Sequence, residues 1–296
     1  MRSISDSGSQ KRETDRSQTI DSECNRGCRQ NTLYIVGIGP GDTDHLSKRA
    51  FDVLTSVNTV VGYTTYIELI RPLIRDKNII STTMTKEVER VQKAIDTSLK
   101  GKPCAIVSSG DPGIYAMAGL AFEICKKKNL FIKTPFSSIE PENEKKSLHI
   151  EVVPGIPALC AGASLLGAPL THDFATISLS DLLTSWETIE RRIEAAAGAD
   201  FVTVLYNPKS KRRIDQIIKA QKIILKYRDK MTPVGIVTGA MRKNQDVKII
   251  PLKDLHTAAV NMQTTVFIGS SASIKYLDYM FTPRGYDKKY NFDESK

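Results

Sequence analysis

The chain has 296 residues, of which 41% are hydrophobic and 25% charged, a composition typical of soluble proteins with one large or two smaller globular domains. No apolar run approaches the roughly 18 residues of a membrane-spanning helix, and the polar start lacks the apolar stretch of a secretory signal, so we predict a cytoplasmic protein with no membrane partner. The net charge of +9 favours an acidic partner, but no arginine-rich run interleaved with aromatic residues is present, which argues against nucleic acid.

The five cysteines are scattered along the chain and do not form the pattern of a disulfide framework. Such an odd, scattered set is typical of a reducing compartment. Cys24 and Cys28 have the spacing of half a metal site, but no second pair or neighbouring histidine completes it. We therefore predict no bound metal.

Residues 1–30 are polar and nearly free of large apolar side chains, so we expect a disordered tail. From Thr32 onward, short apolar runs alternate with helical patterns, which predicts an α/β fold. We assign residues 31–147 to an N-terminal α/β domain with a mostly parallel sheet. Its predicted strands are LYIVGI, NTVVGY, KNII and CAIVSS, and its predicted helices lie over 45–54, near Tyr66 and over 86–99.

The segment 128–147 is rich in charges and turn formers, which is typical of a long surface excursion or of a domain boundary. We assign residues 148–283 to a C-terminal α/β domain and 284–296 to a tail. The second half is richer in strand patterns, so its sheet is expected to be mixed in direction. The strands are HIEVVPG, FATISLS, FVTVLYN, PVGIVTG, VKIIPL and TTVFIGS, and the helices are ALCAGASLLG, one around Ile189 and one from about 213 to 227.

Two glycine-rich loops follow predicted strands in the first half, GIGPGD at 37–42 and SSGDPG at 108–113. In the first, the third glycine comes one residue early for a dinucleotide fingerprint, and Pro40 lacks the N–H that a pyrophosphate site needs. The second carries Asp111 where a phosphate cradle would carry a lysine. Each loop alone can be a tight turn. Together they favour one crevice for a ligand with ribose hydroxyls and a sulfonium or ammonium charge, as in S-adenosylmethionine.

Two junctions in the second half are less specific. VPGIPA at 153–158 is typical of a strand-turn-helix connection, with Pro157 in the first helical turn. YNPKSKRR at 206–213 places four basic residues at the predicted start of a helix, where each cation costs some tenths of a kcal/mol unless an anion offsets it. Such departures from local preference are enriched at functional sites, although long basic side chains can also extend into solvent.

The two glycine loops and the α/β pattern together resemble the tetrapyrrole methylase family, or class III methyltransferases, over about residues 32–282. Two more specific stretches are LGAPLTHDFATISLSDLLTSWE at 166–187 and YNPKS at 206–210 followed by Arg213. They are similar to the members that methylate carbon 17 of precorrin-3B or cobalt-factor III. Ser185 replaces the proline usual in those members. The resemblance implies a two-domain fold with a cofactor cleft between the domains.

The resemblance also implies the ligands. S-adenosylmethionine is the expected methyl donor, and a tetrapyrrole with several carboxylates is the expected substrate, which basic side chains should surround. The candidate substrate-binding residues are Lys209, Arg213 and Arg242. The expected cofactor-binding residues are Pro40, Ser109, Gly110, Asp111, Ile114, Pro157, Ala158, Tyr206, Asn207 and Ala240, with Thr264 and Thr265 as weaker candidates.

Methyl transfer from a sulfonium needs no metal and depends mainly on holding donor and acceptor carbon in line. The family reaction also contracts the macrocycle, which requires proton transfers. The candidates for these transfers are His172, Asp173, Asp181 and Tyr206, although a structural role fits Asp181 equally well. The residues leave open whether the substrate is metal-free precorrin-3B or cobalt-factor III. Because relatives commonly pair, we expect a homodimer.

Two other interpretations remain at this point. Another class III methylase, of the diphthine synthase or ribosomal RNA ribose methylase type, would share the glycine loops, but the stretch 166–187 argues against both. A non-catalytic tetrapyrrole-binding or nucleotide-binding protein is the second, and the intact cofactor loops argue against it.

Overall fold

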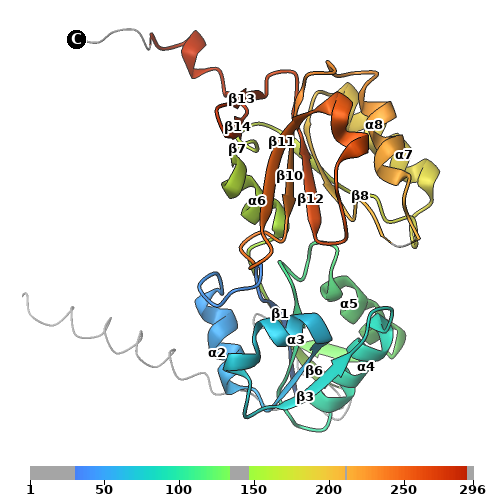
Figure 1. The fold of residues 1–296 in the computed structure, drawn as a ribbon. Helices are drawn as coiled ribbons and strands as arrows, with labels where there is room; N and C mark the ends of the chain where they lie inside the picture. Colours follow the sequence, from blue (N-terminus) through green and yellow to red (C-terminus); the bar gives the residue numbers. More distant parts are fainter. Residues whose placement is uncertain (1–30, 134–146, 211, 292–296) are drawn as a thin grey trace, which may run out of the picture.

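The computed structural model describes residues 31–133, 147–210 and 212–291, which form two lobes, each built on one large β-sheet (Figure 1). The tail predicted over 1–30, including Cys24 and Cys28, lies outside the described residues. The α/β fold class, with a parallel first sheet and a mixed second sheet, is confirmed. None of the described helices combines the length and the apolar character needed to cross a bilayer.

The first sheet has six strands in the order β3-β2-β4-β1-β6-β5, and every neighbouring pair is parallel. Its strands are β1 (Thr32–Gly37), β2 (Thr59–Tyr63), β3 (Asn78–Thr82), β4 (Cys104–Ser108), β5 (Phe131–Lys133) and β6 (Ser147–Val153). The helices of this lobe are α2 (Lys48–Ser56), α3 (Thr64–Leu69), α4 (Glu87–Ser98) and α5 (Met117–Lys127), with a short 3-10 turn, η1 (Arg71–Leu73).

Alternating side chains of β1 explain why helices cover both faces of this sheet. Leu33 and Ile35 pack in the cluster that includes α4 and α5, whereas Tyr34 and Val36 pack in the cluster that includes α2 and α3. A strand that is buried on both sides is apolar at every position, and β1 is buried throughout. Parallel strands also place all their carboxyl ends at one edge of the sheet, and that edge faces the second lobe (Figure 1).

The strand β6 corrects the predicted division of the chain at residue 147. The sequence pattern grouped HIEVVPG with the second half, but β6 pairs in parallel with β1 and with β5 inside the first sheet. The five register pairs with β1 place β6 in the first sheet, although it follows the charged segment in the sequence. The segment 128–147 therefore contains β5 and runs into β6, two paired strands of one sheet, so the first sheet continues past residue 147. That the two halves fold as separate domains stays a prediction.

The second sheet has five strands in the order β11-β10-β12-β9-β8. Only the β8–β9 pair is parallel, and the other pairs are antiparallel. Its strands are β8 (Phe174–Ser178), β9 (Val202–Tyr206), β10 (Pro233–Thr238), β11 (Asp246–Pro251) and β12 (Thr264–Ile268). The helices are α6 (Ala158–Leu166), α7 (Trp186–Gly198) and α8 (Gln216–Ile224), with the 3-10 turns η3 (Leu252–Thr257) and η4 (Tyr286–Lys288). A small sheet of β13 (Ile274–Tyr276), β14 (Tyr279–Phe281) and β7 (Gly167–Ala168) adjoins it.

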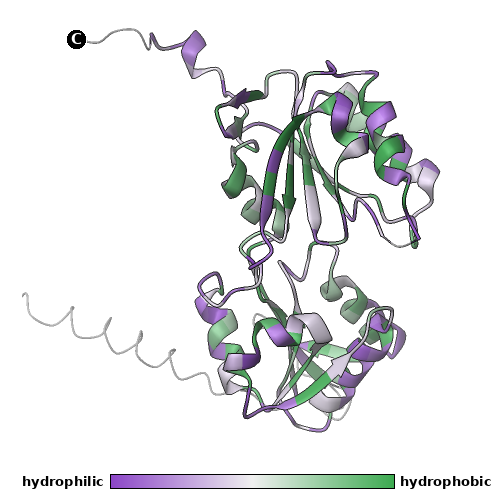
Figure 2. Ribbon diagram, viewed as in Figure 1, coloured by the Kyte–Doolittle hydropathy of each residue, from purple (hydrophilic) through white to green (hydrophobic). Residues whose placement is uncertain are grey.

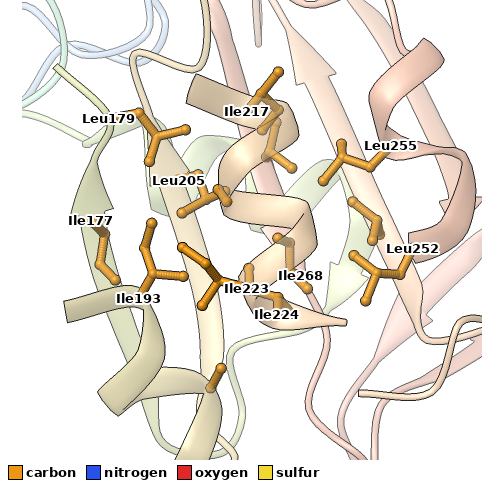
Figure 3. Close-up of a cluster of buried hydrophobic side chains, with 14 of the residues drawn as sticks. Ile177, Leu179, Ile193, Leu205, Ile217, Ile223, Ile224, Leu252, Leu255 and Ile268 are labelled. Atoms are coloured by element: carbon orange, nitrogen blue, oxygen red, sulfur yellow. The ribbon is translucent and has the colours of Figure 1, made fainter. Parts of the chain in front are cut away.

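Helices cover both faces of the second sheet as well. On one face α7, α8 and η3 enclose a cluster of buried leucine, isoleucine and valine side chains (Figure 3). On the other face α6 approaches β12 so closely that a Cβ on Gly162 would lie 2.6 Å from the Phe267 ring. The hydropathy colouring shows apolar strands in the middle of each lobe and polar residues on the outer sides of the helices (Figure 2). This packing fixes the loops that point toward the first lobe.

Candidate functional site

The two glycine-rich loops of the first lobe are bonded to each other. Because β1 and β4 are parallel neighbours, the loops that follow them leave the same edge of the sheet. Gly110 donates its N–H to the Gly39 carbonyl at 2.7 Å, and Gly39 donates to the Gly110 carbonyl at 3.2 Å. Both residues have positive φ, 65° at Gly39 and 69° at Gly110, which glycine adopts without strain.

A third loop, which follows β6, packs against the first two with backbone on backbone. A Cβ on Gly155 would lie 2.3 Å from the Gly110 carbonyl oxygen, and a Cβ on Gly37 would lie 2.6 Å from the same atom. Neither position can hold a side chain without moving a backbone. The junction at 153–158, which the sequence indicated only as a helix start, is therefore the third wall of one backbone assembly.

Asp111 holds two of these loops together, a role that the sequence did not indicate. One carboxylate oxygen accepts the Gly113 N–H at 2.8 Å, and the other accepts the Gly155 N–H at 3.2 Å. The carboxylate thus ties the loop after β4 to the loop after β6. The sequence predicted it as a direct partner of the cofactor, but it does not line the cavity described below, so its structural role is to position the loops.

Arg242 links the two lobes. It lies in the turn after β10, and its Nε donates to the Pro40 carbonyl at 2.6 Å while its Nη2 donates to the Ser109 hydroxyl at 2.7 Å. Burial lowers the pKa of this guanidinium. The structure shows its Nε and Nη2 bonded to the two glycine-rich loops, and its predicted role as a ligand of substrate carboxylates stays a prediction.

A small cavity lies where these loops meet the second sheet. Arg242 forms part of its wall, together with Val237 and Gln263, which the sequence analysis missed because a buried strand valine and a turn glutamine carry no local signal. The remaining lining residues were all predicted to bind the cofactor: Pro40, Ser109, Gly110, Ala158, Ala240 and Thr265. The fold thus brings residues from four separate loops, from the start of α6 and from β10 and β12 to one place.

Tyr206 stands beside this cavity at the end of β9. Its hydroxyl accepts the Leu159 N–H at 2.9 Å, and its ring centroid lies 5.2 Å from that of Tyr115. Burial raises the pKa of Tyr206 to about 12. The phenol is therefore neutral at neutral pH and holds the first turn of α6, a positioning role that is better supported than proton transfer.

Three other residues predicted to bind the cofactor, Ile114, Asn207 and Thr264, do not line the small cavity. Ile114 packs in the apolar cluster around α6. Asn207 has φ of 52° and donates its side-chain N–H to the Ser178 hydroxyl at 2.9 Å. The Thr264 hydroxyl lies 2.8 Å from that of Thr238, away from the cavity that its neighbour lines.

Arg213 does not stand at a helix start. The helix α8 begins at Gln216, so the unfavourable interaction with a helix N-terminus that the sequence indicated does not arise. The Arg213 Nη1 donates to the carbonyls of Leu179 and Asn207, each at 3.0 Å, which ties the ends of β8 and β9 together. These bonds give Arg213 a structural role, and its predicted role at substrate carboxylates stays a prediction. Lys209 lies in the same half-buried segment and forms no ion pair within the part of the chain that the structure describes.

The four candidates for proton transfer are not brought together. His172 and Asp173 precede β8, whereas Tyr206 ends β9, and the parallel register separates these ends by four residue steps, roughly 13 Å. Asp181 accepts from the Gln216 amide at 2.8 Å and lies 3.8 Å from the Arg213 Nε. A structural role therefore fits Asp181, and His172 and Asp173 lie at the wrong end of the sheet for the cavity. Among the described residues, no three His, Cys, Asp or Glu side chains are grouped as metal ligands would be.

Several solved structures with this fold are named as methyltransferases. The crystal structure of the methyltransferase CobJ superposes with a TM-score of 0.75 at 29% identity, and the match covers 86% of this chain and all of that one. Uroporphyrin-III C-methyltransferase from Thermus thermophilus, complexed with S-adenosyl homocysteine, matches over 80% of this chain and 97% of that one, with a TM-score of 0.59. At 19% identity the second likeness shows the fold alone. Fold and site thus define a methyltransferase of the two-lobed α/β type.

The sequence comparisons then give the family. The model of the tetrapyrrole (corrin/porphyrin) methylases matches residues 32–256, and the chain belongs to this family. The cobalt-factor III methyltransferase of Priestia megaterium is 46% identical over 89% of this chain, which spans 47% of that longer protein. The probable cobalt-factor III C(17)-methyltransferase of Salmonella typhimurium is 40% identical over 86% of this chain and 99% of its own length.

Proposed function

We propose that the protein transfers a methyl group from S-adenosylmethionine to carbon 17 of cobalt-factor III or of metal-free precorrin-3B, with contraction of the macrocycle, in corrin synthesis. The observation that carries the proposal is the 40% identity to the Salmonella protein named for this reaction, which this chain matches over 99% of its length. The stretches at 166–187 and 206–210 support the same specificity over that of a diphthine synthase or an RNA methylase.

The small cavity, of about 40 Å³, has room for only part of the adenosyl group, so we expect its walls to form one side of the cofactor site. Pro40, Gly110, Ala158 and Ala240 present backbone or small apolar surface, as sites for flat ligands do. Thr265 also lines the cavity. When bound, S-adenosylmethionine supplies an activated methyl group on its sulfonium. These walls carry two hydroxyl side chains, Ser109 and Thr265, and a single cation, Arg242, whose Nε and Nη2 are bonded to protein groups, which fits a ligand of this kind better than a phosphate.

The chain contributes mainly by positioning. Arg242 holds Pro40 and Ser109 in place from the opposite lobe, and Tyr206 holds the first turn of α6. Rigid walls of this kind keep donor and acceptor carbon in line, and positioning can contribute roughly 7 to 11 kcal/mol at most. The positive balance of the chain fits a substrate with several carboxylates. We also propose that the protein is a homodimer and is located in the cytoplasm. Sedimentation of the purified protein tests the homodimer.

The test is incubation of the purified protein with methyl-labelled S-adenosylmethionine and, in separate reactions, cobalt-factor III and precorrin-3B. Mass spectrometry of the tetrapyrrole should show one added labelled methyl, and the reactive substrate identifies its metal state. If neither tetrapyrrole gains mass while calorimetry still shows cofactor binding, the carbon-17 assignment is wrong. A protein that binds both ligands but transfers no methyl would support the non-catalytic alternative.

A further inference from the structure

A second and larger cavity, of about 510 Å³, lies against the same loops. Its walls come from the segment between β1 and α2 and from the segment between β6 and α6. Pro157 lines this cavity, and the next residue, Ala158, lines the small one. The two cavities therefore lie against the same turn at the start of α6.

One residue that lines the larger cavity, His45, is paired with Asp42 behind it, and the sequence analysis did not single out this pair. The Nδ1 of His45 lies 2.6 Å from the Asp42 Oδ1, and the His45 backbone N–H donates to the same oxygen at 3.0 Å. A carboxylate at Nδ1 favours the tautomer with the proton on that nitrogen, which leaves Nε2 free to accept one. The His45 side chain is 35% exposed, so it is accessible from the cavity that it lines.

The turn that carries His45 is fixed on two sides. A Cβ on Gly39 would lie 2.9 Å from the His45 carbonyl oxygen, so the turn rests directly on the first glycine-rich loop. Ser47 caps α2 by accepting the Ala50 N–H, and its hydroxyl donates to the Pro154 carbonyl at 3.2 Å. The sequence predicted a helix from His45, but α2 begins at Lys48, which leaves the histidine in the loop beside the cavity.

The remaining walls suit a flat apolar ring system. Leu46, Pro154, Ile156 and Pro157 give apolar surface, and exposed Ile156 is 38% accessible. The polar side chains of the lining are those of Asp44, His45, Ser47 and Cys160, and imidazole is the one among them that exchanges protons readily near neutral pH. A base oriented by a carboxylate beside an apolar cavity is a recurring arrangement for proton transfer.

We infer that His45, oriented by Asp42, accepts the proton that the tetrapyrrole must lose when it is methylated; this inference rests on the proposed function. The sulfur–methyl bond breaks with its electron pair left on sulfur, and the new bond to carbon 17 takes an electron pair from the macrocycle. The macrocycle thereby gains one positive charge and regains neutrality by releasing an N–H or O–H proton to the His45 Nε2. The Asp42 carboxylate stabilises the resulting imidazolium, and the proton later passes to water.

The test compares His45→Ala and His45→Gln with the control His256→Gln, which changes an exposed histidine of the second lobe. Single-turnover methyl transfer to cobalt-factor III or precorrin-3B should fall by about 10²-fold to 10⁴-fold in both His45 variants. Calorimetry should show S-adenosylmethionine affinity within about twofold of wild type, and the control should keep wild-type rates. Added imidazole should restore part of the rate of His45→Ala, because a free base can occupy the vacated space.

Each failure has a separate meaning. Wild-type protein that methylates neither tetrapyrrole would overturn the proposed function. Active wild type with an equally active His45→Ala would overturn the role of His45 and leave the proposed function standing. A slow His45→Ala that imidazole does not rescue would show that the Asp–His pair only shapes the turn, and this result would also overturn the inference.

Discussion

The first lobe contributes mainly backbone to the site, whereas the second contributes side chains. Gly39, Gly110 and Gly155 meet through carbonyl and amide groups, with no room for a Cβ at Gly155. Arg242 and Tyr206 come from the second sheet and act through a guanidinium and a phenol. A site wall made of backbone cannot be adjusted by substitution without distorting the fold, whereas side-chain contacts can be removed one at a time. Mutations should therefore affect the two sides differently.

The largest effect is expected for Gly155→Ala, on the backbone side. Its Cβ would lie 2.3 Å from the Gly110 carbonyl, so the loops must separate, at a cost of about 3 kcal/mol of unfolding free energy or more. The matched control is Gly119→Ala on the exposed side of α5, where nothing lies within 4 Å. That change should stabilise the protein by about 0.5 to 1 kcal/mol. Urea unfolding measures both, and similar values for the two variants would contradict the close packing.

Arg242→Met tests the side-chain link between the lobes. It removes charge-assisted hydrogen bonds to Pro40 and Ser109, each worth roughly 1.5 to 3 kcal/mol in related cases. We expect the S-adenosylmethionine Kd to rise by about tenfold, equivalent to about 1.4 kcal/mol, because the loops lose their register. The control is Lys243→Met, an exposed neighbour with the same charge change. Equal Kd values for the two variants, measured by calorimetry, would remove Arg242 from the site.

Tyr206→Phe tests a single hydrogen bond at the start of α6. The change leaves the Leu159 N–H without its acceptor and should cost about 1 to 3 kcal/mol of unfolding free energy. The control is Tyr227→Phe, whose exposed hydroxyl bonds Glu194 and should contribute little. Thermal unfolding of both variants gives the comparison, and an unchanged melting temperature for Tyr206→Phe would mean that water replaces the phenol.

The smallest expected effect is on alkaline stability. The pKa of Tyr206 is raised to about 12 in the folded protein, above its ordinary value of about 10. The unfolded chain therefore releases this proton first, and the contribution of Tyr206, complete below about pH 10, is lost as the pH rises toward 12. Wild type should lose more stability than Tyr206→Phe over this window. Parallel curves would show that Tyr206 ionises at the same pH in both states.

Strands with strong apolar patterns and clear turn signals were predictable from the sequence, and β1, β2, β4 and β9 lie where the patterns placed them. The helix α5 was missed because its start carries no signal: Ala116 precedes it and makes no capping side-chain bond. The strand β6 was recognised but assigned to the wrong half, since strand pairing with β1 is set by contacts far apart in the sequence.

For the site, the sequence predicted the loops that form it but not the contacts between distant side chains. Glycine loops after strands indicate a crevice because only the backbone there can approach a ligand closely, and their residues do line one cavity. The substrate-binding roles of Arg242 and Arg213 stay predictions; the sequence did not reveal that both also donate to backbone carbonyl groups of other segments. The contact of Arg242 with Pro40 spans 202 positions of the chain, which no local pattern reveals.

The most direct test of the site is a crystal structure of the protein with S-adenosyl homocysteine. The adenosine should lie in the small cavity between Pro40, Ala240 and Thr265, with the sulfur directed toward the larger cavity beside His45. Adenosine in the larger cavity, or outside both, would contradict the division of the site into a cofactor side and a substrate side.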